Sequence, residues 1–316
     1  MNRNGRDLKE SVLKFVEEAE TLAIFVPYIK LNVLKEILSQ TRNCRYIVVR
    51  WEVKDLLERA SDLEIYEVCK EKKISLFRNA RLHLKLYLDA DKAYLTTANI
   101  SSRALNYGKY ENYNYEMGVK IDKLELEDRI YLQNILDESQ LIDDRMMDAI
   151  KEQLSLLALD EEGGDFEFKN IADKKDFLLS SLPMSEDINK LKEYYKSKSA
   201  PTQVEYDCMV HDLSLYTIPT GLKEEEFLNR LRVFFFEHPF IQAFLKELNS
   251  AGGELYFGRV RQWLAANCAD SPTPRAWEVT KNVQILYHWI ETLGSGKYAV
   301  DVPGTHSQRI FLSNIF

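Results

Sequence analysis

The chain has 316 residues, of which 45% are hydrophobic and 29% are charged, and its formal net charge at pH 7 is −8. This balance is typical of globular proteins that bury a sizeable core, and the length predicts two domains or one domain with a substantial appendage. No apolar run approaches the roughly 20 residues that span a bilayer, and residues 1–15 read as an amphipathic helix without a signal-peptide core. The composition therefore argues against a membrane-spanning protein, and we expect a cytoplasmic one.

The distribution of charge and the spacing of the cysteines limit the possible functions further. Residues 1–120 carry 21 Lys and Arg against 17 Asp and Glu, whereas residues 121–200 carry 11 against 20 and residues 201–316 carry 10 against 13. A locally basic face can hold a polyanion on an acidic protein, although ordinary surface variation would give the same asymmetry. We expect reduced core thiols and no metal site, because no metal-ligand spacing is shared by the four cysteines, Cys44, Cys69, Cys208 and Cys268.

Helical and strand periods alternate over the first 80 residues. Apolar residues at helical spacing precede a short apolar run, and the alternation then repeats. The pattern predicts helices over residues 8–19, 31–39 and 54–72 and strands over residues 22–29, 45–50 and 75–78. Alternation of this kind predicts an α/β fold, in which helices pack over a sheet.

The next segment has the period of a strand. Leucine occupies every second position from Leu82 to Leu88, with His83 and Lys85 between the leucines. A period of two places the leucines on one face and His83 with Lys85 on the other. A second strand is expected over residues 93–97, and residues 112–119 alternate again, with Glu116 on their polar face.

The rest of the chain is mainly helical. A helix over residues 123–158 precedes the charged stretch EEGGDFEFKN at residues 161–170, whose glycine pair makes it a candidate linker. Later helices end in a hairpin over residues 296–312, and this order is typical of a winged-helix module. We expect an α/β domain over residues 1–158, a linker or helical connector over residues 159–203, and a mainly helical C-terminal domain over residues 204–316.

His83 and Lys85 carry the strongest chemical signal. An imidazole can attack phosphorus and form a covalent phospho-histidine, and a neighbouring ammonium can stabilise the charge of the transition state. H-x-K alone is weak, because such a pair is more often an ordinary polar strand face. Specificity comes from the residues that follow: Asp89, then Thr96, Thr97, Ala98 and Asn99, then Glu116.

This order of residues resembles the motif of the phospholipase D superfamily, in which H-x-K is followed by Asp, then Gly-Ser-x-Asn, then a downstream Glu. The segments IFVPYIKLNVLKEIL and IVVRWEVKDLLERASDLEIYEVCKEKKI also resemble the nuclease branch of phospholipase D-like proteins. The likeness covers about residues 20–120 well and about residues 121–200 loosely. It implies a phospholipase D-like mixed sheet flanked by helices, followed by the mainly helical C-terminal domain.

The resemblance implies a role for each matched residue. His83 would be the nucleophile, and Lys85 and Asn99 would bind the phosphate oxygens. Thr97 matches the family's serine and keeps its hydroxyl. Glu116 would hold the imidazole in the right tautomer and orientation.

Two departures from the family pattern affect these expectations. Three residues rather than four separate Lys85 from Asp89, and Thr96 replaces a glycine, which limits how closely the backbone can approach a phosphate. Either change implies an altered strand end, a different substrate fit or lost activity. The retained His, Lys, Asn, hydroxyl and Glu side chains of the motif argue against lost activity. Asp89 is expected to shape the turn or support the site rather than to contact substrate.

The resemblance also implies a homodimer. The family mechanism uses two motifs, in which one histidine attacks and the other protonates the leaving oxygen. Only His83 of the five histidines begins an H-x-K. A chain with a single copy needs the second from another subunit, which two-fold pairing would supply.

Further residues are candidate substrate contacts. Tyr28 and Arg50 lie at predicted strand ends, where ligands usually sit in open sheets. Arg78, Arg81 and Arg103 belong to the same basic stretch and are candidate contacts to a nucleic-acid backbone. Capping or solvated charge is the alternative for each. In the C-terminal domain the candidates for phosphate contact are Arg259, Arg261, Arg275 and Arg309.

The leading hypothesis is a metal-independent phosphodiesterase, a DNA endonuclease that needs no cofactor and whose C-terminal domain recruits substrate or a protein partner. The resemblance further implies a role in bacterial restriction or anti-phage defence. Two alternatives stay open. The chain could be a partner-dependent or catalytically silent subunit of a larger defence complex, which the net negative charge and Thr96 favour. It could also be a phospholipase or phosphatidyltransferase, although no membrane-binding helix is evident.

Overall fold

The computed structural model describes residues 1–106, 112–157, 175–303 and 307–313, so the candidate linker at residues 161–170 lies outside the described residues. The chain divides into two units, each with its own hydrophobic core. The first comprises Met1–Glu125 and Ile135–Asp173, and the second comprises Leu126–Asn134 and Lys174–Phe316. The boundary between them falls within helix α5 (Leu126–Asp137).

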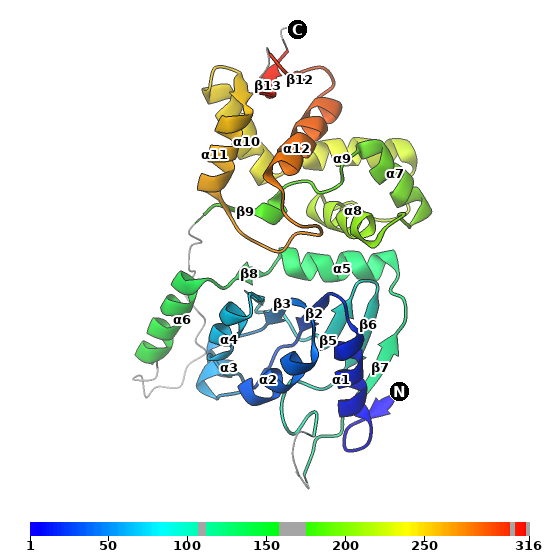
Figure 1. The fold of residues 1–316 in the computed structure, drawn as a ribbon, viewed down its shortest axis with the longest axis vertical. Helices are drawn as coiled ribbons and strands as arrows, with labels where there is room; N and C mark the ends of the chain where they lie inside the picture. The colour runs from blue at the N-terminus through cyan, green and yellow to red at the C-terminus, as the bar shows by residue number, and fades with distance from the viewer. Residues whose placement is uncertain (107–111, 158–174, 304–306, 314–316) are drawn as a thin grey trace. The chain divides into compact units, whose positions relative to one another are not determined.

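The first unit is built on an eight-stranded mixed sheet in the order β1-β7-β6-β5-β2-β3-β4-β8 (Figure 1). β2, β3 and β4 are parallel neighbours, whereas the other pairings are antiparallel. The strands are β1 (Asn2–Arg3), β2 (Leu22–Phe25), β3 (Cys44–Val49), β4 (Ser75–Arg78), β5 (Leu86–Asp89), β6 (Lys92–Thr96), β7 (Met117–Ile121) and β8 (Gln140–Leu141). Every residue of β2 is buried, as expected for a central strand covered on both faces.

Amphipathic helices cover this sheet. Helix α1 (Leu8–Glu18) buries Leu8, Val12, Phe15 and Val16, which recur on one helical face. They join a core cluster that also contains strand residues such as Ile24. The other helices of the unit are α2 (Leu31–Gln40), α3 (Val53–Leu57), α4 (Ile65–Glu71) and α6 (Asp144–Leu157). The expected sheet flanked by helices is confirmed.

Two predicted helices are interrupted. The helix expected over residues 54–72 divides into α3 and α4, because the chain turns at Arg59, whose φ is +56°, and the amide N–H groups of Ala60 and Ser61 bond to the Asp55 carbonyl. The helix expected over residues 123–158 divides into α5 and α6. Between them β8 pairs with β4, so sheet pairing overrides the local helical pattern.

The segment that carries His83 and Lys85 precedes β5 instead of lying within a longer strand. The ladder between β2 and β5 ends at the pair Phe25–Leu86, and Pro27 has no N–H to extend it. On the other side the Thr96 amide still donates to the Lys85 carbonyl at 3.0 Å. Of the two strands that flank β5, only β6 is therefore hydrogen-bonded to Lys85 among the described residues.

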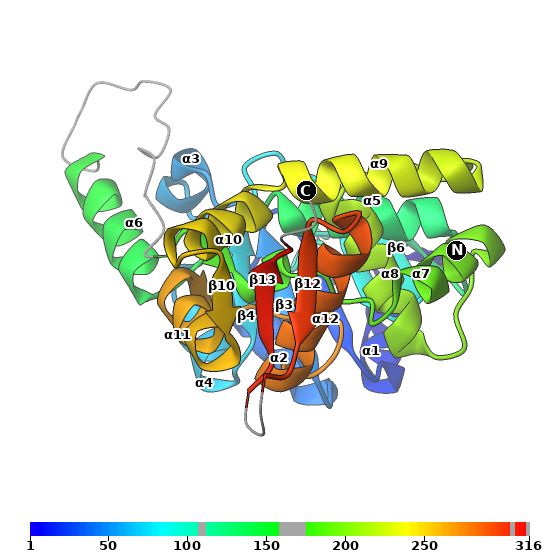
Figure 2. The ribbon, with the colours of Figure 1, turned by 90° about the horizontal axis from the view of Figure 1, so that it is seen from above.

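The second unit is mainly helical, as expected, and ends in a small sheet. Figure 2 shows β10, β13 and β12 side by side, with antiparallel pairing on both sides of β13. Its helices are α7 (Ile188–Ser197), α8 (Gln203–Leu215), α9 (Glu224–Glu237), α10 (Pro239–Ser250), α11 (Phe257–Asn267) and α12 (Val279–Leu293), with the 3-10 helix η1 (Leu179–Ser181). Its strands are β9 (Phe177–Leu178), β10 (Glu254–Tyr256), β11 (Cys268–Ala269), β12 (Tyr298–Asp301) and β13 (Arg309–Leu312).

Aromatic residues contribute to the core of the second unit, where Phe235 and Trp289 are fully enclosed. The buried Asp212 carboxylate accepts hydrogen bonds from the backbone N–H groups of Met184 and Ser185 and contacts the His211 ring at 2.9 Å. Within the described residues of both units, no helix combines the length and the apolarity needed to cross a membrane.

Candidate active site

Strand direction gathers one end of six strands at a single edge of the sheet, here called the site edge. β2, β3 and β4 end at this edge because they are parallel. β5 runs antiparallel to β2 and therefore begins there, β6 ends there, and β7 begins there. The site edge thus receives residues that are far apart in the sequence: Tyr28, Arg50, Arg78, His83, Lys85, Thr97, Asn99 and Glu116.

Thr96 fixes the turn that leaves β6. Its buried hydroxyl donates to the Met117 carbonyl at 2.9 Å and accepts from the Ala98 amide at 3.1 Å. The threonine that stands in place of the family's glycine thus links the turn to β7. Its side chain orders the turn that carries Thr97, which matches the motif's serine, and Asn99, which is predicted to bind phosphate oxygens.

Glu116 is held by the neighbours of His83 and not by His83 itself. The Thr97 hydroxyl donates to Glu116 Oε2, and the Asn114 amide donates to Oε1 at 3.3 Å. Within the described part of the chain, no hydrogen bond to the exposed His83 imidazole is found. That Glu116 orients the His83 imidazole therefore stays a prediction.

Lys85 lies half-buried beside His83. Its Nζ donates to the His83 backbone carbonyl at 3.0 Å. Burial lowers the pKa of Lys85, the positive charge of Arg50 lowers it further, and the negative charge of Glu116 opposes both. The charges of Arg50 and Glu116 therefore both act on Lys85.

Arg50 is fixed by partners that the sequence argument missed. Its Nε donates to Asp55 Oδ2 at 2.8 Å, and its Nη2 reaches Asp55 Oδ1 and the Tyr28 hydroxyl. The guanidinium carbon lies 4.8 Å from the centre of the Tyr28 ring, and Glu52 lies 3.1 Å from Nε. The bond to Asp55 raises the pKa of Arg50, so the group is held charged but closely compensated. The E-x-x-D spacing of Glu52 and Asp55, a capping-box pattern, is the signal that could have found Asp55.

Asn99 presents an unsatisfied polar atom at the site edge. Its Oδ1 is buried and has no hydrogen-bond partner among the described residues. The backbone on either side is tied to the end of β2, since the Ile100 amide donates to the Tyr28 carbonyl at 3.2 Å. Rotating the amide by 180° exchanges Oδ1 for Nδ2, which would donate to a phosphate oxygen.

Asp89 lies at the opposite edge of the sheet. Its Oδ1 accepts from the backbone N–H groups of Glu20 and Thr21 at 3.0 and 2.9 Å. It therefore stabilises the entry of the chain into β2. The three residues between Lys85 and Asp89 are the first three residues of strand β5, which ends at Asp89.

The other candidate cations of the first unit differ in their surroundings. Arg78 Nε donates to the Trp51 carbonyl at 2.9 Å. The largely exposed Arg81 pairs with Glu138 at 2.9 Å. Arg103 is exposed, and its backbone carbonyl accepts from the Asn4 side chain at 2.7 Å. Arg81 and Arg103 are thus surface cations outside the hydrogen-bonded group at the site edge.

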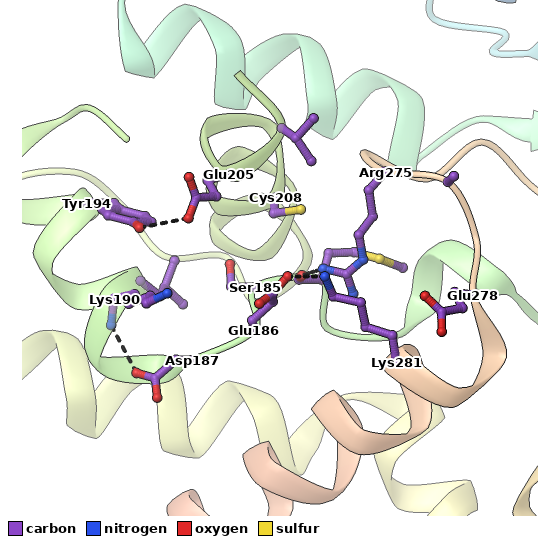
Figure 3. Close-up of a pocket in the computed structure, with 14 residues that line it drawn as sticks. Ser185, Glu186, Asp187, Lys190, Tyr194, Glu205, Cys208, Arg275, Glu278 and Lys281 are labelled. Atoms are coloured by element: carbon purple, nitrogen blue, oxygen red, sulfur yellow. Dashed lines mark hydrogen bonds and ion pairs between the residues drawn. The ribbon is translucent and has the colours of Figure 1, made fainter. Parts of the chain in front are cut away.

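Three of the four candidate cations in the second unit are already engaged. Arg259 pairs with Glu247 at 2.9 Å, and Arg309 pairs with Asp301 and Glu254. Figure 3 shows Arg275 in a pocket whose other labelled residues include several carboxylates. Its guanidinium donates to the Met184 carbonyl and to Asn282. The charges of Arg259, Arg275 and Arg309 are therefore poorly placed to contact a phosphate, whereas Arg261 is exposed.

The four cysteines are buried and unpaired, and burial raises the pKa of each thiol. Across the described ranges, no group of three or more His, Cys, Asp or Glu side chains could hold a metal ion.

Comparison with known proteins gives structural neighbours alone, since no protein-family model and no curated protein matches the chain. It is similar to NucT from Helicobacter pylori at 18% identity, covering 43% of this chain and 91% of NucT, with a TM-score of 0.35. Phosphatidylserine synthase from Haemophilus influenzae Rd KW20 matches at 16% identity over 54% of this chain and 45% of that protein, with a TM-score of 0.36. TrmBL2, an archaeal chromatin protein whose structure shows a novel mode of DNA binding, matches at 18% identity over 50% of each chain, with a TM-score of 0.26. At these identities and TM-scores the likenesses establish neither a family nor an activity.

The coupling at the site edge predicts opposite shifts of one pKa. Glu116→Gln should lower the pKa of Lys85, because the carboxylate raises it, and Arg50→Gln should raise it, because the guanidinium lowers it. NMR titration of protein carrying ¹³C-labelled lysine measures both shifts. Glu125→Gln, at an exposed carboxylate of the same unit, is the control and should leave Lys85 unchanged. A Lys85 pKa that moves in neither site variant would contradict the coupling.

Proposed function

We propose that the chain is a phosphodiesterase of the phospholipase D superfamily, acting as a metal-independent DNA endonuclease, with residues 1–158 as its catalytic domain. The observation that supports this proposal is that Lys85, Thr97, Asn99 and Glu116 lie at the same edge of the sheet as the exposed His83. These are the side chains that the motif resemblance requires, and they arrive there from three different strand ends. The Lys85 ammonium, the Thr97 hydroxyl and the Asn99 amide fit a phosphodiester, whose non-bridging oxygens need positive charge and donors.

The chemistry follows from this arrangement. A ring nitrogen of His83 attacks phosphorus as the bond from phosphorus to the leaving oxygen breaks, and the leaving oxygen takes a proton from a second histidine. Water then attacks the phospho-histidine, the P–N bond breaks, and the second histidine recovers a proton. Lys85 and Asn99 hold the non-bridging oxygens in both steps.

The second histidine would be His83 of another subunit. Exposed apolar side chains beside the site edge support this pairing, because a large apolar surface usually marks an interaction site. Tyr115 is 99% exposed and Met117 is 43% exposed, and both lie at the start of β7 next to Glu116. No described residue forms a hydrogen bond with the His83 imidazole, so its orientation would come from the partner subunit or from the substrate.

Substrate contacts extend the proposal. Arg50 and Tyr28 would line the site as a fixed pair, and Arg81 and Arg103 would meet the backbone of the nucleic acid from the surface. The C-terminal domain would recruit DNA or a protein partner, through residues 204–316, with residues 159–203 as the connector. A role in anti-phage defence and a cytoplasmic location rest on the motif resemblance and the composition.

The first test is cleavage of plasmid and single-stranded DNA in the presence of EDTA. Wild type should cut, and His83→Ala should lose at least about 10³-fold in rate, because no other group can form the covalent intermediate. His288→Ala, in the second unit, is the matched control and should cut like wild type. Cutting that needs a divalent metal, or that survives in His83→Ala, would contradict the proposal. DNA left intact by all three proteins would instead favour a partner-dependent or silent subunit, and cleavage of lipid vesicles alone would favour a phospholipase.

A second test concerns the dimer. Tyr115→Ser combined with Met117→Ser should shift the protein towards monomers and lower its activity in parallel, since a monomer lacks the second histidine. Sedimentation velocity at the assay concentration measures the first effect. Tyr131→Ser combined with Leu156→Ser removes two equally exposed apolar side chains elsewhere and should change neither property. A wild-type monomer with undiminished activity would rule out the shared site.

A further inference from the structure

We propose that the second unit carries a groove that binds the phosphate backbone of a single nucleic-acid strand. The hollow measures about 560 Å³ and lies between α9, α10 and the turn from α12 into β12. Three cations line it, Arg232, Lys246 and Lys297, each from a different one of these elements. This inference rests on the proposed action on DNA and names the surface that would hold the strand.

The positive charge of the groove is uncompensated. None of the twelve described residues that line it is Asp or Glu, although acidic residues outnumber basic ones in the whole chain. Arg232, Lys246 and Lys297 are exposed, and none of them forms an ion pair with a described residue. They differ in this respect from Arg259 and Arg309, whose carboxylate partners lie within 3 Å. Lys297 Nζ lies 5.4 Å from the centre of the Tyr298 ring, a contact that leaves its charge without a carboxylate partner. Three such cations around one hollow produce a local positive field that attracts a polyanion.

Two carboxylates near the groove in the sequence make other contacts. Glu247, next to Lys246 in the sequence, pairs with Arg259. Glu291, one turn before the end of α12, accepts a hydrogen bond from the Val300 amide at 3.0 Å. Neither is a lining residue of the groove.

Aromatic rings and neutral donors complete a nucleotide-like site. Phe236 and Tyr298 line the groove and stack on each other, with ring centres 6.1 Å apart and planes inclined by 22°. Phe236 is half-buried, so part of its ring is accessible to a base. The amide of Asn249 and the hydroxyl of Ser250 are exposed at the rim and can donate to phosphate oxygens.

The occupant that fits is an unpaired strand. Proteins that bind single strands combine a positive groove along the backbone with aromatic rings on which bases stack. A base paired inside a duplex cannot reach Phe236, because it is already stacked between its neighbours. The hollow lies within the range of about 300–1,000 Å³ that holds ligands of nucleotide size.

The test is fluorescence anisotropy with a labelled single-stranded oligonucleotide of about 20 thymidines, on the His83→Ala background so that the strand stays intact. The groove variant replaces Arg232, Lys246 and Lys297 with Ala. Its affinity should be at least about tenfold weaker, and the slope of log affinity against log salt should shrink by about 2, since each lost phosphate contact removes about 0.7 for single strands. Phe236→Leu should weaken binding while leaving the salt slope unchanged, because stacking releases no counterions.

The matched control removes three exposed cations of the same unit that lie outside the groove, Lys190, Lys196 and Lys223. It should bind the strand as the parent does. Equal affinity and salt slope in the groove variant and the control would overturn the proposal. A larger loss for duplex DNA or for anionic vesicles than for the single strand would overturn the assigned occupant. A protein that binds the strand through the groove but never cleaves would keep the groove and reject the endonuclease.

Discussion

The register of β5 between β2 and β6 is the constraint on which the proposed site depends. β5 pairs Leu86 with Phe25 on one side and with Leu95 on the other. A slip of one residue would exchange the two faces of the strand and bury polar side chains in the core. The register is fixed at the far end by Asp89, which anchors the two residues before β2. Because of this register, the segment with His83 and Lys85 lies at the same edge of the sheet as the turn with Thr97 and Asn99.

The site edge combines a rigid part with an open one. Arg50, Tyr28 and Asp55 form a hydrogen-bonded group in which the Asp55 side chain is 4% exposed. Breaking such a buried pair lowers the stability of the fold, because it leaves one charge uncompensated. This group therefore has a fixed position at the site edge. The His83 imidazole, by contrast, is exposed and forms no hydrogen bond with a described residue. The proposed nucleophile is therefore accessible to a phosphodiester.

Local patterns in the sequence were sufficient for the frame of the first unit. The alternating leucines from Leu82 to Leu88 and the buried run at β2 predicted strands, and the mixed sheet with helices is confirmed. The interruption of the helices at Arg59 and at β8 was not predictable, because it depends on a turn conformation and on pairing with a distant strand. The side chains of the motif could be named from their spacing, whereas their actual partners could not. Thr97 with Glu116 is one such pair, and Arg50 with Asp55 is another.

The basic residues of the second unit show the same limit. Arg259, Arg275 and Arg309 stood out in the sequence, yet their charges are satisfied by carboxylates and carbonyls within the fold. The cations of the groove lie in separate elements and acquire a common surface through tertiary packing alone. Charge in a sequence therefore indicates a binding surface only after its partners are known.

The central claim is that His83 forms a covalent bond to phosphorus, and trapping that intermediate tests it most directly. Wild-type protein would be mixed with labelled DNA, quenched with alkali within the first turnover and digested with trypsin, which cuts after Arg81 and Lys85. The account predicts a nucleotide adduct on the four-residue peptide from Leu82 to Lys85, attached through His83. Rapid cleavage with no adduct on this peptide, or with an adduct on another residue, would contradict it.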